Sequence, residues 1–399
     1  MLEKNGYHGS SIDCPQCGQT AGFHGYRERH PLSIGGTVRC LRAYYLCRSC
    51  GHGGCPFDQA VGLPDANLTP AVERLTALAG AVADSFEKGA ELLEEMAGVR
   101  LCESTVQRTT QGVGQRIADA WAAGRQFGLQ HPWRFFHDAL GRSIAYLELD
   151  ATGVRQQGPH GEQVDGRMAY VGMIGNPLPD PQRCFSDRRK PGERLAARYV
   201  SGLYPLADMG PLLRRQAAQV GMDAAEVWVA ITDGGAGLEA FIASNFPRVA
   251  AVILDYWHVA EHLARLAAVV HASDDEQARS LAKEWSRILK EEGGTTLIAV
   301  LEAWPWPERV VGLKAARAEL LTYLKNHVHR MDYPTYEANG WYIGSGAIES
   351  ACKTVVGQRL KGAGMRWSER GAHEVCHVRA LYRSEPRQWL AFWQRDIRP

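Results

Sequence analysis

The sequence predicts an α/β protein in which a mixed sheet core carries an all-helical insertion and follows a cysteine-rich ribbon and a helical domain. Three observations lead to this prediction. Two matched Cys-x-x-Cys-Gly pairs lie near the N-terminus, short β-rich runs alternate with helical patterns after residue 143, and a long helical pattern rich in Leu, Ala, Lys and Glu begins near residue 260. With 399 residues, 45% of them hydrophobic, the chain is long enough for several domains with a large core.

The N-terminal cysteines predict a structural zinc site. Six of the ten cysteines lie within the first 55 residues, and four of them form the pairs Cys14/Cys17 and Cys47/Cys50, each followed by glycine. Such a knuckle lets backbone amides face the sulfurs, and two knuckles on separate hairpins complete a tetrahedral site of four thiolates. Free buried cysteines and a redox pair are the alternatives, which the matched pairs disfavour.

Basic and aromatic residues surround these knuckles. Arg42 and Arg48, with neighbouring Tyr44 and Tyr45, suit contact with a DNA backbone because a rigid ribbon would present them together. An ordinary solvated face is the alternative.

A helix-turn-helix pattern follows the ribbon. An apolar helical pattern ends at Gly98, a short turn follows, and Ser104 and Thr105 begin a second helix. Gln107 and Arg108 would then lie near the start of a recognition helix and contact DNA. A plain helical hairpin in a linker domain is the alternative.

Three acidic residues predict a metal site of a different kind. Asp150 closes one apolar run, Asp233 closes another before two glycines, and Glu349 begins a helix after a glycine-rich entry. An aspartate at the end of a buried strand is costly to desolvate unless a cation or a donor meets it. Carboxylate oxygens of this kind bind Mg2+ or Mn2+. Turn chemistry would explain Asp150 or Asp233 taken alone, but not the three acids together.

Three neighbours of this set receive separate interpretations. Glu148 is not expected to be a ligand, since strand alternation places it on the face of Asp150 but farther from the strand end. His258 could orient a carboxylate or a scissile phosphate, with a helix cap as the alternative. Trp341 could stack on an unpaired base, although a position in the core is favoured for it.

The charge distribution predicts a local basic surface. The net charge is only +1, but residues 352–399 contain ten Lys or Arg against four Asp or Glu. Phosphate binding needs such a local surface and is compatible with a neutral total. Four residues after Glu349 are candidates to line a DNA path, with solvated helix charges as the alternative: Lys353, Arg359, Lys361 and Arg366.

Four segments, in order, resemble one known family. The segments ELDATGV, AITDGGAGLEAFI, LDYWHVAEHL and GSGAIES with QRLKGAGMRWS resemble bacterial insertion-sequence transposases of the ISKra type, within the Mutator-like DDE group. The resemblance implies an RNase H-like core in which Asp150, Asp233 and Glu349 form the DDE triad. It also implies that Asp255 and His258 match the D-x-x-H element that precedes a helical insertion.

The resemblance completes the expected organisation. We expect a zinc ribbon at 1–62, a helical helix-turn-helix-like DNA-binding domain at 63–135, the first part of the catalytic core at 136–259, the helical insertion at 260–340, and the last part of the core with a basic tail at 341–399. Metal-dependent DNA cleavage and strand transfer are the implied reactions. The alternatives are a domesticated, inactive DNA-binding regulator and a nuclease or resolvase without strand transfer.

Partners and location follow from the same interpretation. The expected partners are the terminal inverted repeats of an insertion sequence and a target DNA, bound by a homodimer or a higher oligomer. The start of the chain lacks the apolar region of a signal peptide, and no run approaches the length of a membrane span. We therefore expect a cytoplasmic, nucleoid-associated protein that does not bind membranes.

Overall fold

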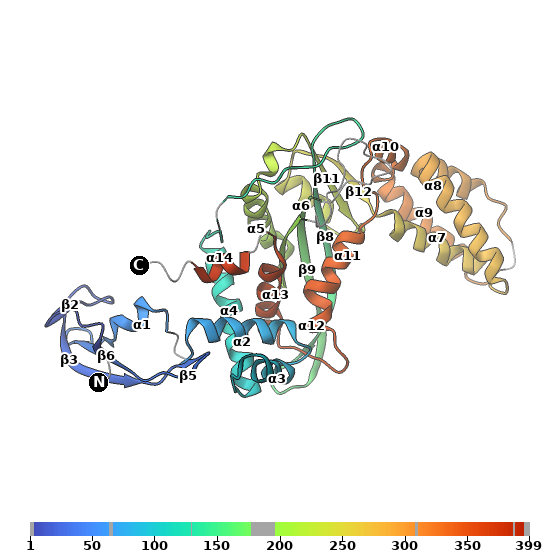
Figure 1. Cartoon of the computed structure of the whole chain (residues 1–399). Coiled ribbons are helices and arrows are strands. Elements are labelled where there is room, and N and C mark those ends of the chain that lie inside the picture. The colour runs from blue at the N-terminus through green and yellow to red at the C-terminus, as the bar shows by residue number, and fades with distance from the viewer. Residues whose placement is uncertain are drawn as a thin grey trace.

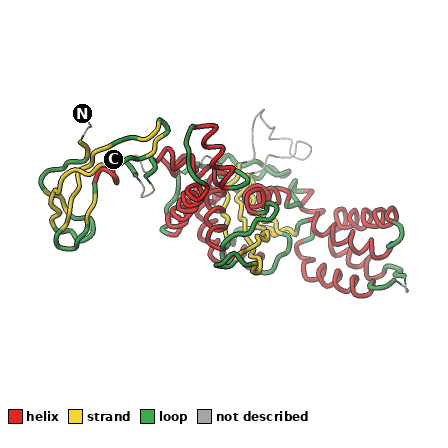
Figure 2. The backbone as a smooth tube through the Cα atoms, turned by 90° about the horizontal axis from the view of Figure 1, so that it is seen from below, coloured by secondary structure: helices red, strands yellow, loops and turns green. Residues whose placement is uncertain are grey.

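The computed structural model describes residues 4–63, 67–128, 130–176, 196–307, 310–385 and 388–394. The last five residues of the predicted basic tail lie outside this set. Figure 1 shows a small β-ribbon at one end, a central sheet surrounded by helices, and a group of long helices at the other end. In the view from below, strands are confined to the ribbon and to the centre of the molecule (Figure 2).

The ribbon is built on one long antiparallel pair, β3 (Thr20–Arg29) and β6 (Cys40–Cys47). Both cysteine pairs lie at the same end of this hairpin, because Ala21 pairs with Cys47 and β2 (Ser11–Asp13) leads directly into Cys14. The smaller elements around the pair are β1 (Lys4–Asn5), β4 (Leu32–Ser33), β5 (Gly36–Thr37), β7 (Gly53–Gly54) and α1 (Pro56–Ala60).

Three helices connect the ribbon to the sheet: α2 (Pro70–Val82), α3 (Phe86–Ala97) and α4 (Glu103–Ala122). Ser85 caps α3 by accepting a hydrogen bond from the backbone of Lys88, and Gly98 ends it in the left-handed conformation. The second helix begins at Glu103, slightly before the predicted Ser104. These helices share an apolar core with α13 (Glu369–Arg383) and the central sheet, so they pack on the core as one body.

The central sheet has the strand order β10-β9-β8-β11-β12. Three strands form an antiparallel meander, β8 (Ile144–Gln157), β9 (Gln163–Asn176) and β10 (Ala196–Gly202), and two shorter strands, β11 (Val227–Thr232) and β12 (Val249–Leu254), run parallel to β8. The predicted mixed α/β sheet is thereby confirmed. The prediction that Asp150 closes its strand is wrong, because β8 continues to Gln157 as a hairpin with β9.

Helices cover both faces of this sheet. Ala145, Leu147 and Leu149 of β8 pack against α5 (Leu206–Gln219) and α6 (Leu238–Asn245), and η1 (Met222–Ala224) follows α5. The opposite face of the meander packs against the C-terminal helices. These are α11 (Gly346–Ala351), the π-helical turn η3 (Cys352–Gly357), α12 (Gln358–Leu360), α13 and α14 (Gln388–Gln394).

The described elements between β12 and the loop before α11 are all helical: α7 (Tyr256–Val270), α8 (Asp275–Ala303), α9 (Leu313–His327), η2 (Val328–Arg330) and α10 (Tyr333–Ala338). Their apolar faces surround the fully buried Trp285, which contacts Trp304 and Trp306. This core is continuous with residues of β11 and β12, which anchors the insertion to the sheet edge. Among the described helices, none combines the length and apolarity that crossing a bilayer requires.

A buried histidine predicts a pH-dependent stability. His377 of α13 is fully buried, with Nδ1 3.3 Å from the Gly114 carbonyl and Nε2 2.6 Å from the Tyr204 hydroxyl. Because a carbonyl only accepts, Nδ1 carries a proton, and in the neutral ring Nε2 accepts from the Tyr204 hydroxyl. Burial, then the nearby His373, lowers the pKa of His377 to about 3.

Only the unfolded chain therefore binds this proton between pH 6.5 and 3. We expect the free energy of unfolding to fall by about 1.4 kcal/mol for each pH unit below 6.5, and this contribution to vanish above 6.5. Urea unfolding of wild type and His377→Gln at pH 7.5 and 5.0 measures it. The variant should lose less stability on acidification than wild type; equal losses would contradict the assignment.

Candidate functional site

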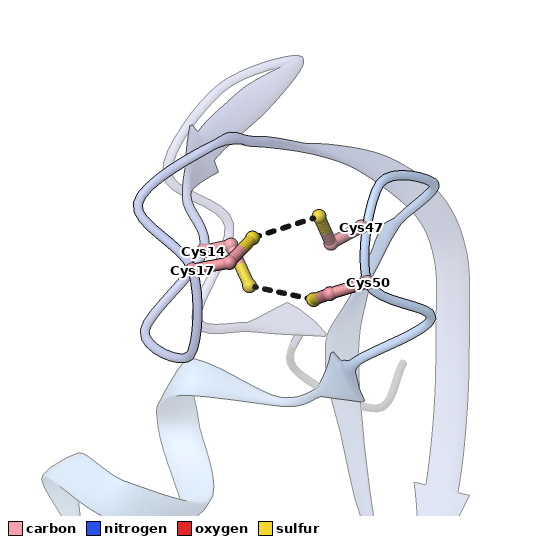
Figure 3. A group of neighbouring side chains, drawn as sticks. All are labelled: Cys14, Cys17, Cys47 and Cys50. Atoms are coloured by element: carbon pink, nitrogen blue, oxygen red, sulfur yellow. Dashed lines mark hydrogen bonds between the residues drawn. The ribbon is translucent and has the colours of Figure 1, made fainter.

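The four predicted zinc ligands come together at the end of the ribbon (Figure 3). The Sγ atoms of Cys14 and Cys50 are 3.6 Å apart, as are those of Cys17 and Cys47, and all four lie within 4.8 Å of one another. Four sulfurs at about 2.3 Å from a central zinc would be about 3.8 Å apart, whereas a disulfide needs about 2.05 Å. The spacing therefore fits a tetrahedral metal site, and the donor set is compatible with structural Zn2+.

The local backbone favours the thiolate form of one ligand, Cys47, whereas the pKa values of Cys17 and Cys50 are raised, with hydrogen bonds from neighbouring thiols among the causes. Amides of Cys50 and Ser49 hydrogen bond to Cys47, and this lowers the pKa of the Cys47 thiol to about 6 despite its burial. Gly18 and Gly51 follow the two pairs with φ of 70° and 76°, the left-handed conformation that glycine adopts without strain. Each knuckle thus turns its amides toward the metal position.

The two arginines predicted to contact DNA from the ribbon have different environments. Arg48 is exposed in the second knuckle. Arg42 is only 9% exposed and is ion-paired with Asp58 of α1. The prediction of a DNA contact is therefore wrong for Arg42, because its charge is neutralised inside the ribbon, where it holds α1 against β6.

The predicted aspartates share one register row of the central sheet. Strands β8 and β11 pair Glu148 with Ile231, so that two residues farther along Asp150 and Asp233 are level. Strands β11 and β12 pair Thr232 with Leu254, so the next residue of each brings Asp233 level with Asp255. Neighbouring strands are about 4.8 Å apart, and residues in register point to the same face. Asp150 on β8 and the residues that directly follow β11 and β12, Asp233 and Asp255, are therefore expected to face one region.

The electrostatics of Asp150 reflect this arrangement. Its carboxylate accepts hydrogen bonds from the backbone of Ala151 and the thiol of Cys352. Its pKa is nevertheless raised, first by burial and then by the negative charges of Asp233 and Glu349. Asp150 therefore lies in the electrostatic field of both other members of the predicted triad.

Glu349 reaches the same region from α11. The Ser345 hydroxyl, at the start of that helix, lies 2.8 Å from Glu349 Oε1 and 2.6 Å from Asp255 Oδ2. Asp255 is only 2% exposed and also accepts hydrogen bonds from the backbones of Ser345 and Trp257. Asp255 therefore fixes the helix that carries Glu349 to the end of β12, a role that the sequence interpretation missed although its strand-end position resembled that of Asp233.

Glu148 is a second acid with a positioning role. It is buried, and its Oε2 accepts a hydrogen bond from the backbone of Ile348. Burial, followed by the charges of Asp255 and Glu349, raises its pKa to about 8. Glu148 therefore contacts the backbone of α11, whereas the strand-end argument used for it fails because β8 continues to Gln157.

The basic residues after Glu349 divide into exposed and buried groups. Lys353 is exposed on the π-helical turn, Lys361 Nζ donates to Thr152 Oγ1 at 2.9 Å, and Arg366 is exposed beside Gln163. Arg359 is only 1% exposed; it donates to the Gly80 and Asp84 carbonyls and lies over the rings of Phe86 and Trp367. A DNA contact by Arg359 is therefore wrong: this side chain joins α12 to the helical domain.

The predicted recognition-helix residues lie in the first turns of α4. Arg108 is exposed, and its guanidinium lies over the N-terminal turn, donating to Ser104 O and Thr105 Oγ1. Gln107 is half-buried beside it. These positions suit contact with a partner, and the exposed Arg108 is the stronger candidate.

His258 lies on the first turn of α7, after Asp255. Its Nε2 is 3.3 Å from Nε2 of His262, which stacks on Tyr323. The Tyr323 hydroxyl in turn lies 3.5 Å from the carbonyl of Asp233. Burial and the charge of Arg265 lower the pKa of His262 to about 4. In the described structure, His258 thus contacts another histidine. His262 and Tyr323 connect it to Asp233, which together with Asp150 and Asp255 is called the acidic row below.

Trp341 occupies the core, as favoured. It is 6% exposed, donates its indole N–H to Asp138 and stacks on Tyr336. Stacking of this side chain on a base is therefore excluded.

The acidic group and the cysteine group differ in compactness. Within the described residues, only the four cysteines form a set of three or more ligating side chains whose ligand atoms all lie within 4.8 Å. The carboxylates of Asp150, Asp233 and Glu349 are more widely spaced. No protein-family model matches this chain, and no curated protein matches it significantly.

Proposed function

We propose that this protein is a DDE-type transposase that uses Mg2+ or Mn2+ to cleave and join DNA strands. One observation carries the proposal: Asp233, the residue after β11, continues the register that brings it level with Asp150 of the neighbouring parallel strand β8, and Glu349 is close enough to raise the pKa of Asp150. A three-stranded antiparallel meander continued by two parallel strands is also the sheet that an RNase H-like core requires.

The three carboxylates do not form a group whose ligand atoms all lie within 4.8 Å of one another, and such an arrangement is compatible with two ions. In two-metal sites the ions are about 3.5–4 Å apart, so the ligands of different ions need not meet. Asp150, whose pKa is raised by the charges of both Asp233 and Glu349, would be a ligand together with them. Bound divalent cations would activate the attacking hydroxyl and stabilise the leaving oxygen.

The chain's own residues would orient this set and the DNA. Asp255 and Ser345 hold the start of α11, and Glu148 holds Ile348, so the direction of Glu349 is set from two sides. Lys361, anchored on Thr152 two residues beyond Asp150, provides a cation for a phosphate near the metal ions. Arg48, Arg108, Lys353 and Arg366 are exposed and could bind the DNA backbone farther away.

A cleavage assay with the full chain tests the proposal. Supercoiled plasmid carrying the DNA that flanks this reading frame should be nicked when Mg2+ or Mn2+ is present and not when it is omitted. Pre-cleaved ends with a free 3′-hydroxyl should then be joined to a second DNA. Nicking without joining would favour a nuclease, and DNA binding without nicking would favour the inactive regulator.

A further inference from the structure

The most exposed aromatic ring of the helical insertion lies beside the acidic row. Trp257 of α7 is 62% exposed, although a tryptophan usually buries most of its surface. Its backbone N–H donates to Asp255 Oδ1, which fixes its position next to the residue that holds α11. An exposed indole at this place is available to a partner.

The indole is nevertheless held in one orientation. Its edge lies against Gly344, where an added Cβ would come within 2.6 Å of Trp257 Cδ1. The ring of Tyr256 packs against it edge-on, with centroids 5.1 Å apart. Because glycine allows the ring to approach the backbone closely, Trp257 is a prepared flat surface rather than a mobile side chain.

Trp257 forms one end of a groove between α7 and α8. The groove has a volume of about 490 Å3, and small residues of α7 and α8 form its floor, including Ala260, Ala264 and Ala282. Its basic lining residues recur on one face of α8: Arg279, Lys283, Arg287 and Lys290. The spacing of three and four residues places these cations side by side along the helix.

The charge of the groove is predominantly positive. Glu291 is the acidic lining residue, paired with Arg287 at 2.6 Å, and Lys290 is paired with Glu337. Arg279 and Lys283 are both exposed, and the hydrogen bond of Arg279 is to a backbone carbonyl, which leaves its charge uncompensated. A flat aromatic ring followed by a row of cations is complementary to an unpaired base followed by its phosphates.

We propose that the α7–α8 groove binds a single-stranded segment of DNA, with one unpaired base stacked on Trp257 and the phosphates that follow it on Arg279 and Lys283. The inference deepens the proposed function, since it names the form of DNA that the acidic row would act on. It rests on the transposase proposal only for the source of the strand, because stacking requires no cleavage.

The test is a binding experiment in which no divalent ion is added. The probe is a duplex with a short single-stranded tail that carries the fluorescent base 2-aminopurine next to the junction, compared with a blunt duplex of the same length. Wild type should quench the unpaired 2-aminopurine. Trp257→Ala should abolish the quenching and weaken binding of the tailed probe by about 5- to 150-fold, whereas Trp257→Phe should retain part of both.

Two further variants separate stacking from general effects. Gly344→Ala leaves the indole chemically unchanged, but the added Cβ would displace the ring from its position, so this variant should also reduce quenching. Lys283→Glu should weaken binding of the tailed probe and reduce its salt dependence by more than one counterion, since it removes a cation and adds an anion. Lys314→Glu, an equal charge change at an exposed position of α9 outside the groove, is the matched control.

Unchanged quenching in Trp257→Ala, or equal losses in Lys283→Glu and Lys314→Glu, would overturn the inference. So would equal binding of the tailed and blunt probes. If plasmid nicking fails but quenching depends on Trp257, the groove is a strand-binding site on a protein that is not a transposase. If nicking succeeds and quenching is absent, the transposase proposal is supported and the proposal that the groove binds single-stranded DNA is rejected.

Discussion

Replacement of Asp150 by asparagine is expected to reduce metal-dependent strand cleavage by about 1,000-fold or more and to leave DNA binding unchanged. The amide has the shape of the carboxylate but no charge, and its NH2 group repels a cation where the carboxylate would bind one. Asp233→Asn should have the same effect, because the two residues are level on adjacent strands. Plasmid nicking and filter binding with the same protein preparation measure the two properties.

A stability measurement adds a readout that a merely structural role would not give. Burial and the charges of Asp233 and Glu349 raise the pKa of Asp150, so the ionised row is electrostatically strained. Without a divalent ion, Asp150→Asn should therefore melt at or above the temperature of wild type. With Mg2+ added, wild type should gain stability and the variant should gain much less.

The control is Asp165→Asn, since Asp165 is an exposed aspartate on β9 away from the row. It should behave as wild type in nicking, binding and melting. Nicking by Asp150→Asn at the wild-type rate would remove the enzymatic assignment, and a lower melting temperature without Mg2+ would show that the carboxylate serves the fold.

Removal of the metal from the four-cysteine site is expected to unfold the ribbon and leave the rest of the protein folded. The buried apolar residues of the ribbon form a very small cluster, in which two of the members are the ligands Cys14 and Cys47. A core of this size does not stabilise a domain, whereas structural zinc contributes about 10–16 kcal/mol of apparent binding energy in small zinc domains. The central sheet has separate, much larger cores.

Limited proteolysis with mass spectrometry measures this effect. Chelation, or Cys14→Ser, should expose residues 4–63 to cleavage while the sheet and insertion stay resistant, and native protein should contain one zinc per chain. Cys102→Ser is the matched control, because Cys102 is exposed at the start of α4, outside the ribbon. A ribbon that remains resistant after complete loss of metal would contradict the structural role.

The four-cysteine cluster could be predicted because it depends on local chemistry, and the same kind of reasoning singled out the three acids as candidates. A knuckle is defined within five residues, and an acid that ends an apolar run already indicates an unusual solvation cost. The alternation of strands and helices predicted the mixed sheet for the same reason, since the period of apolar residues is a local property.

Whether an individual charged or aromatic side chain is buried or exposed was decided by the tertiary structure alone. Arg42 and Arg359 look in the sequence like surface cations, yet packing partners from other segments bury them with an ion pair or with carbonyl acceptors. The sequence around Trp341 and Trp257 does not show which of the two is exposed. The packing of the folded chain buries Trp341 and leaves Trp257 exposed. The sequence thus determined which residues are candidates for metal binding, because ligand type and strand periodicity are local. The structure determined which charged and aromatic side chains are buried and which are exposed, because burial is a property of contacts between distant segments.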